Sequence, residues 1–210
     1  MRVIEVFADV CCPFTHVGLR RLVEERSRLR RYEVVVRARA WPLELVNGEP
    51  LNAHDVAEEV EALQGAVAPD LFASFDPTRF PTTSLPAFAL AACAYTGGEH
   101  VGEDVSLALR TALFEEGRDV ADPDELTAIA RTAGMELSYG QNEHAPYDDW
   151  QDGRLRGVLG SPHFFVDDSG FFCPALTIRR VDDNLRVTPD VEAFSAFLKA
   201  VFDKTSPAAP

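Results

Sequence analysis

Apolar and polar positions at the start of the chain predict a strand, a helix and a second strand. Residues 3–8 form an apolar run of strand length, and residues 13–29 carry apolar side chains at helical spacing. Residues 33–41 alternate, with small apolar side chains on one face. This order of elements is typical of a βαβ unit.

The middle of the chain, from a turn at residues 47–50 to about residue 157, has the apolar spacing of helices and no convincing strand. Asp122 can cap one helix, Glu125 can complete a capping box, and Gly134 ends the same helix. The other helices are expected around Val56, Val60 and Leu63, at residues 85–95, around Val105, Leu109, Ala112 and Leu113, and at residues 146–157.

Strand signals return near the C-terminus. Residues 164–166 and 171–172 flank a turn at residues 167–170 and predict a hairpin, and a further strand is expected near residues 185–187. Residues 206–210 are expected to be a loose tail. The order predicts an α/β fold in which a helical segment interrupts a single sheet. A terminal helix is also expected, and the side chains on its inward face are those of Val191, Phe194, Leu198 and Val201.

Composition and charge exclude several kinds of partner. The chain has 210 residues, a net charge of −14 and no basic stripe, which argues against a nucleic-acid partner. No apolar segment approaches the ~20 residues that span a bilayer, and no signal region is recognised, so we expect a cytoplasmic protein with no membrane partner. Four cysteines in a chain of this length do not make a disulfide framework, and any disulfide is expected to be transient.

The most informative polar position is Cys12, which lies between the first strand and the first helix and is followed by Pro13, Phe14 and Thr15. Unpaired amides and the helix dipole at a helix start favour a thiolate, so a lowered thiol pKa is expected. Thr15 lies on the same face and can donate its hydroxyl toward the sulfur. His16, one turn on, is either an imidazolium that stabilises the thiolate or a partly exposed helix residue.

Two motifs resemble a known family. Residues 9–18 (DVCCPFTHVG) resemble the active-site opening of the DsbA-like thioredoxin-fold superfamily, and residues 159–166 (LGSPHFFV) resemble its cis-proline segment. Residues 113–120 resemble a helix end of two branches of that superfamily, 2-hydroxychromene-2-carboxylate isomerases and kappa-class glutathione transferases. The resemblance implies a discontinuous thioredoxin-like domain, residues 1–45 and 158–205, with a helical insertion subdomain at residues 46–157.

The resemblance also assigns roles to particular residues. It implies that Cys12 is the nucleophilic thiol, that Pro162 is a cis-proline and that the backbone of Ser161 pairs with a bound thiol or peptide. The expected catalytic residues are Cys12, Thr15 and His16, and the expected thiol-binding residues are Pro13, Phe14, Ser161, Pro162 and Cys173.

The chain departs from the family's CxxC pattern at Thr15, which cannot resolve a mixed disulfide. Two kinds of chemistry remain for this motif: Cys12 acts as a single thiol, or a bound small thiol is the nucleophile. Cys173 is either an unconventional resolving thiol, expected opposite residue 164 and near Pro162, or a small buried hydrophobe. Cys11 and Cys93 are expected in the core. The cysteine and histidine spacing does not match a zinc site, so no metal is expected.

These observations predict a thiol-disulfide oxidoreductase or thiol transferase that acts through Cys12 on a small-molecule or peptide thiol or disulfide. No tightly bound cofactor is expected, a small thiol such as glutathione or mycothiol would be the co-substrate, and a homodimer is left open. One alternative is a small-thiol-dependent isomerase or transferase of aromatic or electrophilic molecules, which turns over without net redox change. The other is a catalytically degenerate thioredoxin-like binding scaffold, which predicts an ordinary thiol pKa.

Overall fold

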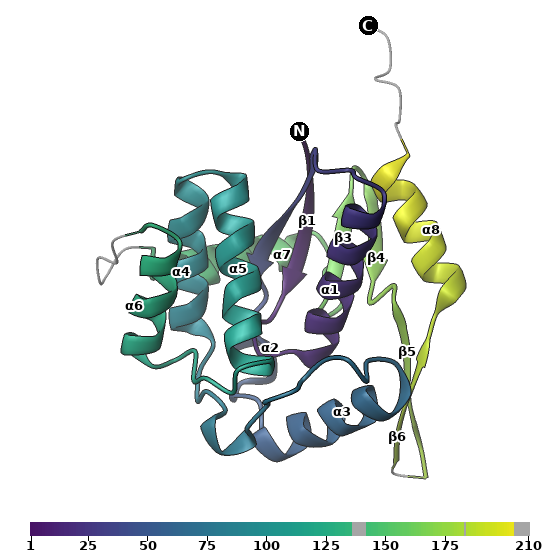
Figure 1. The fold of residues 1–210 in the computed structure, drawn as a ribbon, viewed down its shortest axis with the longest axis horizontal. Coiled ribbons are helices and arrows are strands. Elements are labelled where there is room, and N and C mark those ends of the chain that lie inside the picture. The colour runs from purple at the N-terminus through teal and green to yellow at the C-terminus, as the bar shows by residue number, and fades with distance from the viewer. Residues whose placement is uncertain (136–141, 183, 204–210) are drawn as a thin grey trace, which may run out of the picture.

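The main sheet of the protein has four strands in the order β2-β1-β3-β4 (Figure 1). The computed structural model describes residues 1–135, 142–182 and 184–203. β1 pairs in parallel with β2, β3 pairs antiparallel with β1, and β4 pairs antiparallel with β3. α1 connects β1 and β2, so the predicted βαβ unit is confirmed. The bounds are β1 Arg2–Ala8, α1 Pro13–Arg28, β2 Val34–Ala40, β3 His163–Val166 and β4 Ser169–Phe172.

The helices predicted for the middle of the chain are present, and their apolar positions around Val56 and Val105 are buried as expected. Short helices at Leu43–Asn47 and Pro77–Arg79 were not predicted. The division at residues 45 and 158 into two folding units stays a prediction. The helices after β2 are α2 Leu43–Asn47, α3 Ala53–Ala66, the 3-10 helix η1 Pro77–Arg79, α4 Leu85–Thr96, α5 Glu99–Phe114, α6 Pro123–Thr132, α7 Ala145–Leu155 and α8 Val191–Phe202.

Helices cover both faces of the main sheet, with α1 in front of it and α7 behind it in Figure 1. Alternate residues of β1, such as Ile4 and Val6, pack with Leu22 of α1 and Phe197 of α8 on one face. The opposite face carries Phe7, whose ring lies beside Gly153 of α7. This two-sided cover fixes the C-terminal end of β1, from which the chain runs into Cys12.

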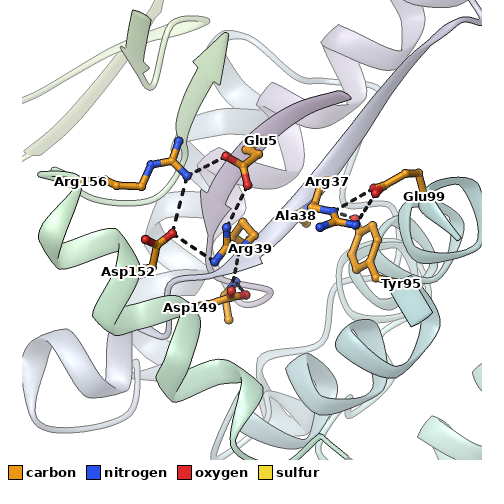
Figure 2. A network of polar contacts seen from close by, with 10 residues as sticks. Glu5, Arg37, Ala38, Arg39, Tyr95, Glu99, Asp149, Asp152 and Arg156 are labelled. Atoms are coloured by element: carbon orange, nitrogen blue, oxygen red, sulfur yellow. Dashed lines mark hydrogen bonds and ion pairs between the residues drawn. The ribbon is translucent and has the colours of Figure 1, made fainter. Parts of the chain in front are cut away.

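The outer edge of β2 is closed by side chains from the surrounding helices. Tyr95 Oη accepts a hydrogen bond from the amide of Ala38 at 2.7 Å, and Asp149 Oδ2 accepts one from the amide of Ala40 at 2.8 Å. Figure 2 shows how Arg39 extends this network from β2 to Glu5 of β1 and to Asp149. Because the edge amides already have partners, β2 cannot easily add a further strand.

The last two strands depart from the prediction of a single sheet. β5 (Leu176–Val181) and β6 (Asn184–Pro189) form a separate two-stranded sheet, which extends beside α3 (Figure 1). β5 was not predicted, because Arg180 occupies a position on the face that carries Ile178 and breaks the alternation of apolar and polar residues.

Two further expectations about helix ends and faces are corrected. Asp122 caps α6, but the carboxylate of Glu125 binds Arg118 at 2.7 Å instead of completing a capping box. In α8, Val191 is 72% exposed because it lies in the first turn, whereas Phe197 is fully buried at the centre of the inward face. The expected tail at residues 206–210 lies outside the described residues. No helix in the described ranges is long and apolar enough to cross a membrane.

Candidate thiol site

Cys12 is the residue immediately before α1, at the end of the loop that follows β1. Its backbone is extended (φ −85°, ψ 114°), and its side chain does not cap the helix. The thiol instead donates to the backbone carbonyl of Ser161, with Sγ and O separated by 3.4 Å. The Ser161–Pro162 peptide bond is cis, and Pro162 lies against Gly18 of α1. Two of the segments singled out from the sequence therefore meet at the sulfur of Cys12.

Two hydroxyl groups accompany the thiol. Thr15 Oγ1 and Ser161 Oγ are hydrogen-bonded at 2.7 Å, and Ser161 Oγ accepts a bond from the amide of Asp9 at 2.8 Å. Both hydroxyls lower the pKa of Cys12. The effect of the Thr15 hydroxyl on the thiol was predicted from the sequence. The effect of the Ser161 hydroxyl was missed, because only the backbone of Ser161 was considered.

The expected lowered pKa of Cys12 is wrong in direction. Burial removes the thiol from water and raises its pKa to about 11, although the hydroxyls of Thr15 and Ser161 act against this effect. The side chain is only 3% exposed, and a carbonyl oxygen accepts its S–H. The resting site therefore favours a protonated thiol, because desolvation outweighs the helix start and the hydroxyls.

His16 is held by residues other than Cys12. Its Nε2 lies 2.6 Å from Glu115 Oε1, and its ring contacts the rings of Phe72 and Phe114. Burial lowers the pKa of His16, although the carboxylate of Glu115 acts against this effect. The side chain is buried, so the partly exposed interpretation is wrong, and burial also disfavours the imidazolium. A neutral ring can donate its Nε2–H to the carboxylate.

The loop that carries Cys12 is anchored by Asp9, a residue the sequence analysis did not select. Asp9 Oδ1 accepts from the amide of Cys11 at 2.7 Å, and Oδ2 accepts from the amide of Leu43 at 2.6 Å. Burial raises the pKa of Asp9 to about 6, although these two amides act to lower it. Arg110, fully buried on α5, donates to the Asp9 carbonyl at 3.3 Å.

Cys173 lies directly after β4, where its amide donates to the carbonyl of Pro162 at 2.9 Å. The expected register was wrong by two residues, because Phe171 and not Cys173 is opposite Phe164. The hairpin turns at residues 167–168, and Cys173 is therefore placed beside Pro162. Burial, together with a smaller effect of the charge of Cys12, raises the pKa of Cys173 to about 12. Cys173 is therefore held beside Pro162, the residue that follows the one contacted by the Cys12 thiol.

The remaining predicted residues divide between the site and the core. Pro13 and Phe14 are buried in the first turn of α1, directly after Cys12. Cys11 is buried, and burial raises the pKa of its thiol well above the ordinary value. Cys93, on α4, is partly buried and lies in a different part of the chain.

Comparison with known proteins gives one family and several similar structures. The family model of the DSBA-like thioredoxin domain matches residues 3–186. A structure of 2-hydroxychromene-2-carboxylate isomerase has a TM-score of 0.59 and 16% identity, over 81% of this chain and 88% of that chain. The cytosolic disulfide reductase DsbM from Pseudomonas aeruginosa has a TM-score of 0.57 and 15% identity, over 94% of this chain and 97% of that chain.

A second structure of DsbM, with GSH, has a TM-score of 0.53 and 14% identity, over 94% of this chain and 97% of that chain. No curated protein matches the sequence. At these identities the similar structures show a shared fold.

Proposed function

Because the chain belongs to the DSBA-like thioredoxin family, we propose that it is a monothiol thiol-disulfide oxidoreductase or thiol transferase whose nucleophile is Cys12. Family membership confirms the resemblance found in the sequence. The observation that carries the proposal is the contact of the Cys12 thiol with Ser161 O at 3.4 Å, beside the hydroxyls of Thr15 and Ser161. A sulfur atom, a carbonyl acceptor and hydroxyl donors are thereby collected at one helix start.

The proposed reaction has two exchange steps. The thiolate of Cys12 attacks a disulfide RS–SR, which forms a Cys12–S–S–R bond and releases one RS⁻. The thiolate of a small thiol then attacks the R-side sulfur of the mixed disulfide. This step forms a new disulfide between R and the small thiol and releases the Cys12 thiolate. The substrate disulfide is reduced and the small thiol is oxidised, so the electrons balance without a bound cofactor. Thr15 and Ser161 stabilise the sulfur anion at the start and the end of this cycle.

The co-substrate that we propose is a small thiol such as glutathione or mycothiol, acting in the cytoplasm. Two observations support it. One similar structure is that of the cytosolic reductase DsbM with GSH, and position 15 of this chain is a threonine, so the motif that begins at Cys12 has no second cysteine of its own to resolve a mixed disulfide. A small co-substrate also suits a thiol that is only 3% exposed. A peptide substrate and a homodimer stay predictions.

Cys173 is proposed as a second route for the resolving step. Its thiolate would attack the Cys12–S–S–R bond, form a Cys12–Cys173 disulfide and release RS⁻. The position of its backbone against Pro162 O supports this route, since Pro162 follows the residue that binds the Cys12 thiol. Cys93, on α4, is the matched control because it is remote in sequence from both segments.

Turnover tests the proposal. Reduced protein is mixed with bis(2-hydroxyethyl) disulfide and glutathione, and formation of glutathione disulfide is followed through glutathione reductase and NADPH. We expect wild type and Cys93→Ser to accelerate the exchange and Cys12→Ser to lose the acceleration. An equal rate in Cys12→Ser would contradict the role of Cys12. If Cys173 resolves the adduct, Cys173→Ser will accumulate a Cys12 mixed disulfide; wild-type levels of that adduct would reject the second route.

A small-thiol-dependent isomerase or transferase is the second candidate. The specific observation in its favour is the raised pKa of Cys12, because a site that keeps its own thiol protonated can still orient the sulfur of a bound thiol through Thr15 and Ser161. This candidate predicts that a small thiol is required for turnover of an aromatic or electrophilic substrate but is not consumed by oxidation. Cys12→Ser would then keep activity, which separates it from the first proposal.

A further inference from the structure

A hydrogen bond from His163 closes the loop formed by residues 159–162, which we call the Ser161 loop. His163 is the first residue of β3 and directly follows this loop. Its Nδ1 accepts a hydrogen bond from the amide of Leu159 at 3.1 Å, which joins the two ends of the loop. Ser161, inside the loop, is the residue whose carbonyl contacts the Cys12 thiol at 3.4 Å. The imidazole is therefore bonded to the segment that carries this contact.

The imidazole of His163 is packed on several sides. The residue is only 6% exposed, and its ring centroid lies 4.6 Å from that of Phe165 and 6.0 Å from that of Phe172. Its Nε2 lies against Gly170, where an added β-carbon would come within 2.8 Å of this nitrogen. Because the packing fixes the ring, Nδ1 stays directed at the amide of Leu159.

The hydrogen bond from Leu159 determines which nitrogen of His163 carries a proton. An acceptor nitrogen is unprotonated, so the neutral ring carries its hydrogen on Nε2. A second proton would have to bind Nδ1, where it would face the N–H of Leu159 and abolish the hydrogen bond. Burial and the positive charge of Arg156 lower the pKa of His163, and both therefore favour the neutral ring.

The charged side chains near the imidazole lie on the same face of the sheet and pair with one another. In the sheet, His163 is opposite Phe7 of β1, and the next residue of β1 on that face is Glu5. Each carboxylate of this group binds an arginine of the group, as Figure 2 shows, and among the described residues none forms an ion pair with His163. The group consists of Glu5 of β1, Arg39 of β2, Asp149 and Asp152 of α7, and Arg156 directly after α7.

The Ser161 loop acts on Cys12 through two atoms of Ser161. The carbonyl oxygen accepts the S–H, and the hydroxyl, which is bonded to Thr15 Oγ1 at 2.7 Å, lowers the pKa of Cys12. An S–H group is a weak donor, whereas a hydroxyl that donates to a thiolate forms a charge-assisted bond of about twice the ordinary strength. Displacement of Ser161 therefore destabilises the thiolate more than the thiol.

We propose that His163 is a positioning residue that holds Ser161 against Cys12, and that a proton on its Nδ1 releases the Ser161 loop. With a neutral imidazole, the Ser161 hydroxyl lies where it stabilises the thiolate. With a protonated imidazole, this support is weakened and the thiol reacts more slowly. The inference rests on the proposed function in that Cys12 is the nucleophile whose reactivity the hydrogen bond controls.

The consequence is a step in the pH profile of Cys12. The rate of a thiolate reaction falls about tenfold per pH unit below the pKa of the thiol. As Nδ1 of His163 gains its proton, the rate should fall by an additional three- to tenfold, roughly the net value of one hydrogen bond, and the tenfold slope should then resume. Because the pKa of His163 is lowered, the step lies on the acid side of the ordinary histidine range.

The experiment measures the reaction of reduced, folded protein with methyl methanethiosulfonate, from which the thiolate displaces methanesulfinate. Samples from pH 4 to pH 8 are quenched with acid and digested with pepsin without reductant, and tandem mass spectrometry separates Cys12 from Cys11. Imidazole ¹⁵N shifts, recorded in parallel, report which nitrogen of His163 carries the proton and the pH at which the second proton binds. Wild type is expected to show the Nε2–H form at pH 8 and a step where the ring titrates.

Two variants of His163 separate the acceptor from its protonation. His163→Asn places Oδ1 where Nδ1 was, an acceptor that gains no proton in this range, so we expect the wild-type rate at pH 8 and no step. His163→Leu has no acceptor, so the rate at pH 8 is expected to be about three- to tenfold lower, also without a step. Asp9, with a pKa of about 6, titrates in the same range in every variant, so only differences from wild type are assigned to His163.

Two controls test for effects of structure. His54, an exposed residue of α3 that lies 3.5 Å from Glu58, is the matched histidine, and His54→Asn is expected to keep the wild-type profile. Hydrogen exchange of the Leu159 amide should be about three- to tenfold faster in His163→Leu and unchanged in His163→Asn. Circular dichroism checks that each variant is folded at each pH.

Three results would overturn the inference. They are a wild-type ring with its proton on Nδ1 at pH 8, a His163→Leu variant that reacts as fast as wild type, and a step that persists in His163→Asn. A ring that stays neutral down to pH 4 would reject the release of the loop by a proton.

These results are distinguishable from a failure of the proposed function, because the reaction with methyl methanethiosulfonate does not require turnover. A step that depends on His163 in a protein that does not exchange disulfides would support this inference and reject the proposed function. Exchange that depends on Cys12 but is the same in wild type and His163→Leu would do the reverse.

Discussion

Replacing Thr15 by Val removes one buried hydroxyl from the thiol site while nearly keeping the shape of the side chain. Thr15 is fully buried, and its Oγ1 lies 2.7 Å from Ser161 Oγ. The hydroxyl also lowers the pKa of Cys12, so the variant should have a less acidic thiol. A hydrogen bond to a charged group contributes about 1.5–3 kcal/mol, which corresponds to a rise of about 1–2 pKa units.

At a fixed pH of 8, the alkylation of Cys12 by iodoacetamide should therefore be about 10- to 100-fold slower in Thr15→Val than in wild type. Urea unfolding should show a loss of about 1 kcal/mol, because Ser161 Oγ loses one buried partner but still accepts from the amide of Asp9. Thr15→Ser keeps the hydroxyl and should react nearly as fast as wild type. An unchanged alkylation rate in Thr15→Val would refute the role assigned to this hydroxyl.

Two further predictions concern stability. Phe197→Ala should lower the free energy of unfolding by about 3–5 kcal/mol, because the ring is fully buried and its centroid lies 4.7 Å from that of Phe164. Calorimetry should show a Tm lower by about 6–20 °C. A decrease of less than about 2 °C would contradict the packing of α8. Asp9→Asn should remove a pH dependence of the free energy of unfolding. Burial raises the pKa of Asp9 in the folded protein to about 6, above its value in the unfolded chain. Wild type should therefore lose about 3 kcal/mol of stability relative to the variant as the pH rises from 3.5 to 7, as measured by urea unfolding. A stability difference that is constant with pH would contradict this account of Asp9.

The helices could be predicted because their sequences record which side faces the core. Val56, Val60 and Leu63 recur at helical spacing and are buried in α3. The same pattern placed Phe194, Leu198 and Val201 correctly on the inward face of α8. It was wrong for Val191, which has the right spacing but lies in the first turn and is 72% exposed. Spacing specifies which residues share a face, whereas the neighbours of each turn are a property of the tertiary structure.

The members of the thiol site could be predicted in part, but their electrostatics could not. Local signals placed Cys12 at a helix start, and the resemblance placed Ser161 beside it, as the 3.4 Å contact shows. The direction of the pKa shift was missed because burial of Cys12 depends on helices far away in sequence.

The most direct test of the central claim, that Cys12 carries the exchange chemistry, is peptide mapping of a trapped mixed disulfide. Reduced Cys173→Ser protein is treated briefly with glutathione disulfide, quenched with acid and digested without reductant. The account predicts a glutathione adduct at Cys12, slower to form in Thr15→Val, and no adduct at Cys93. An adduct distributed over the other cysteines with Cys12 unmodified would contradict the account.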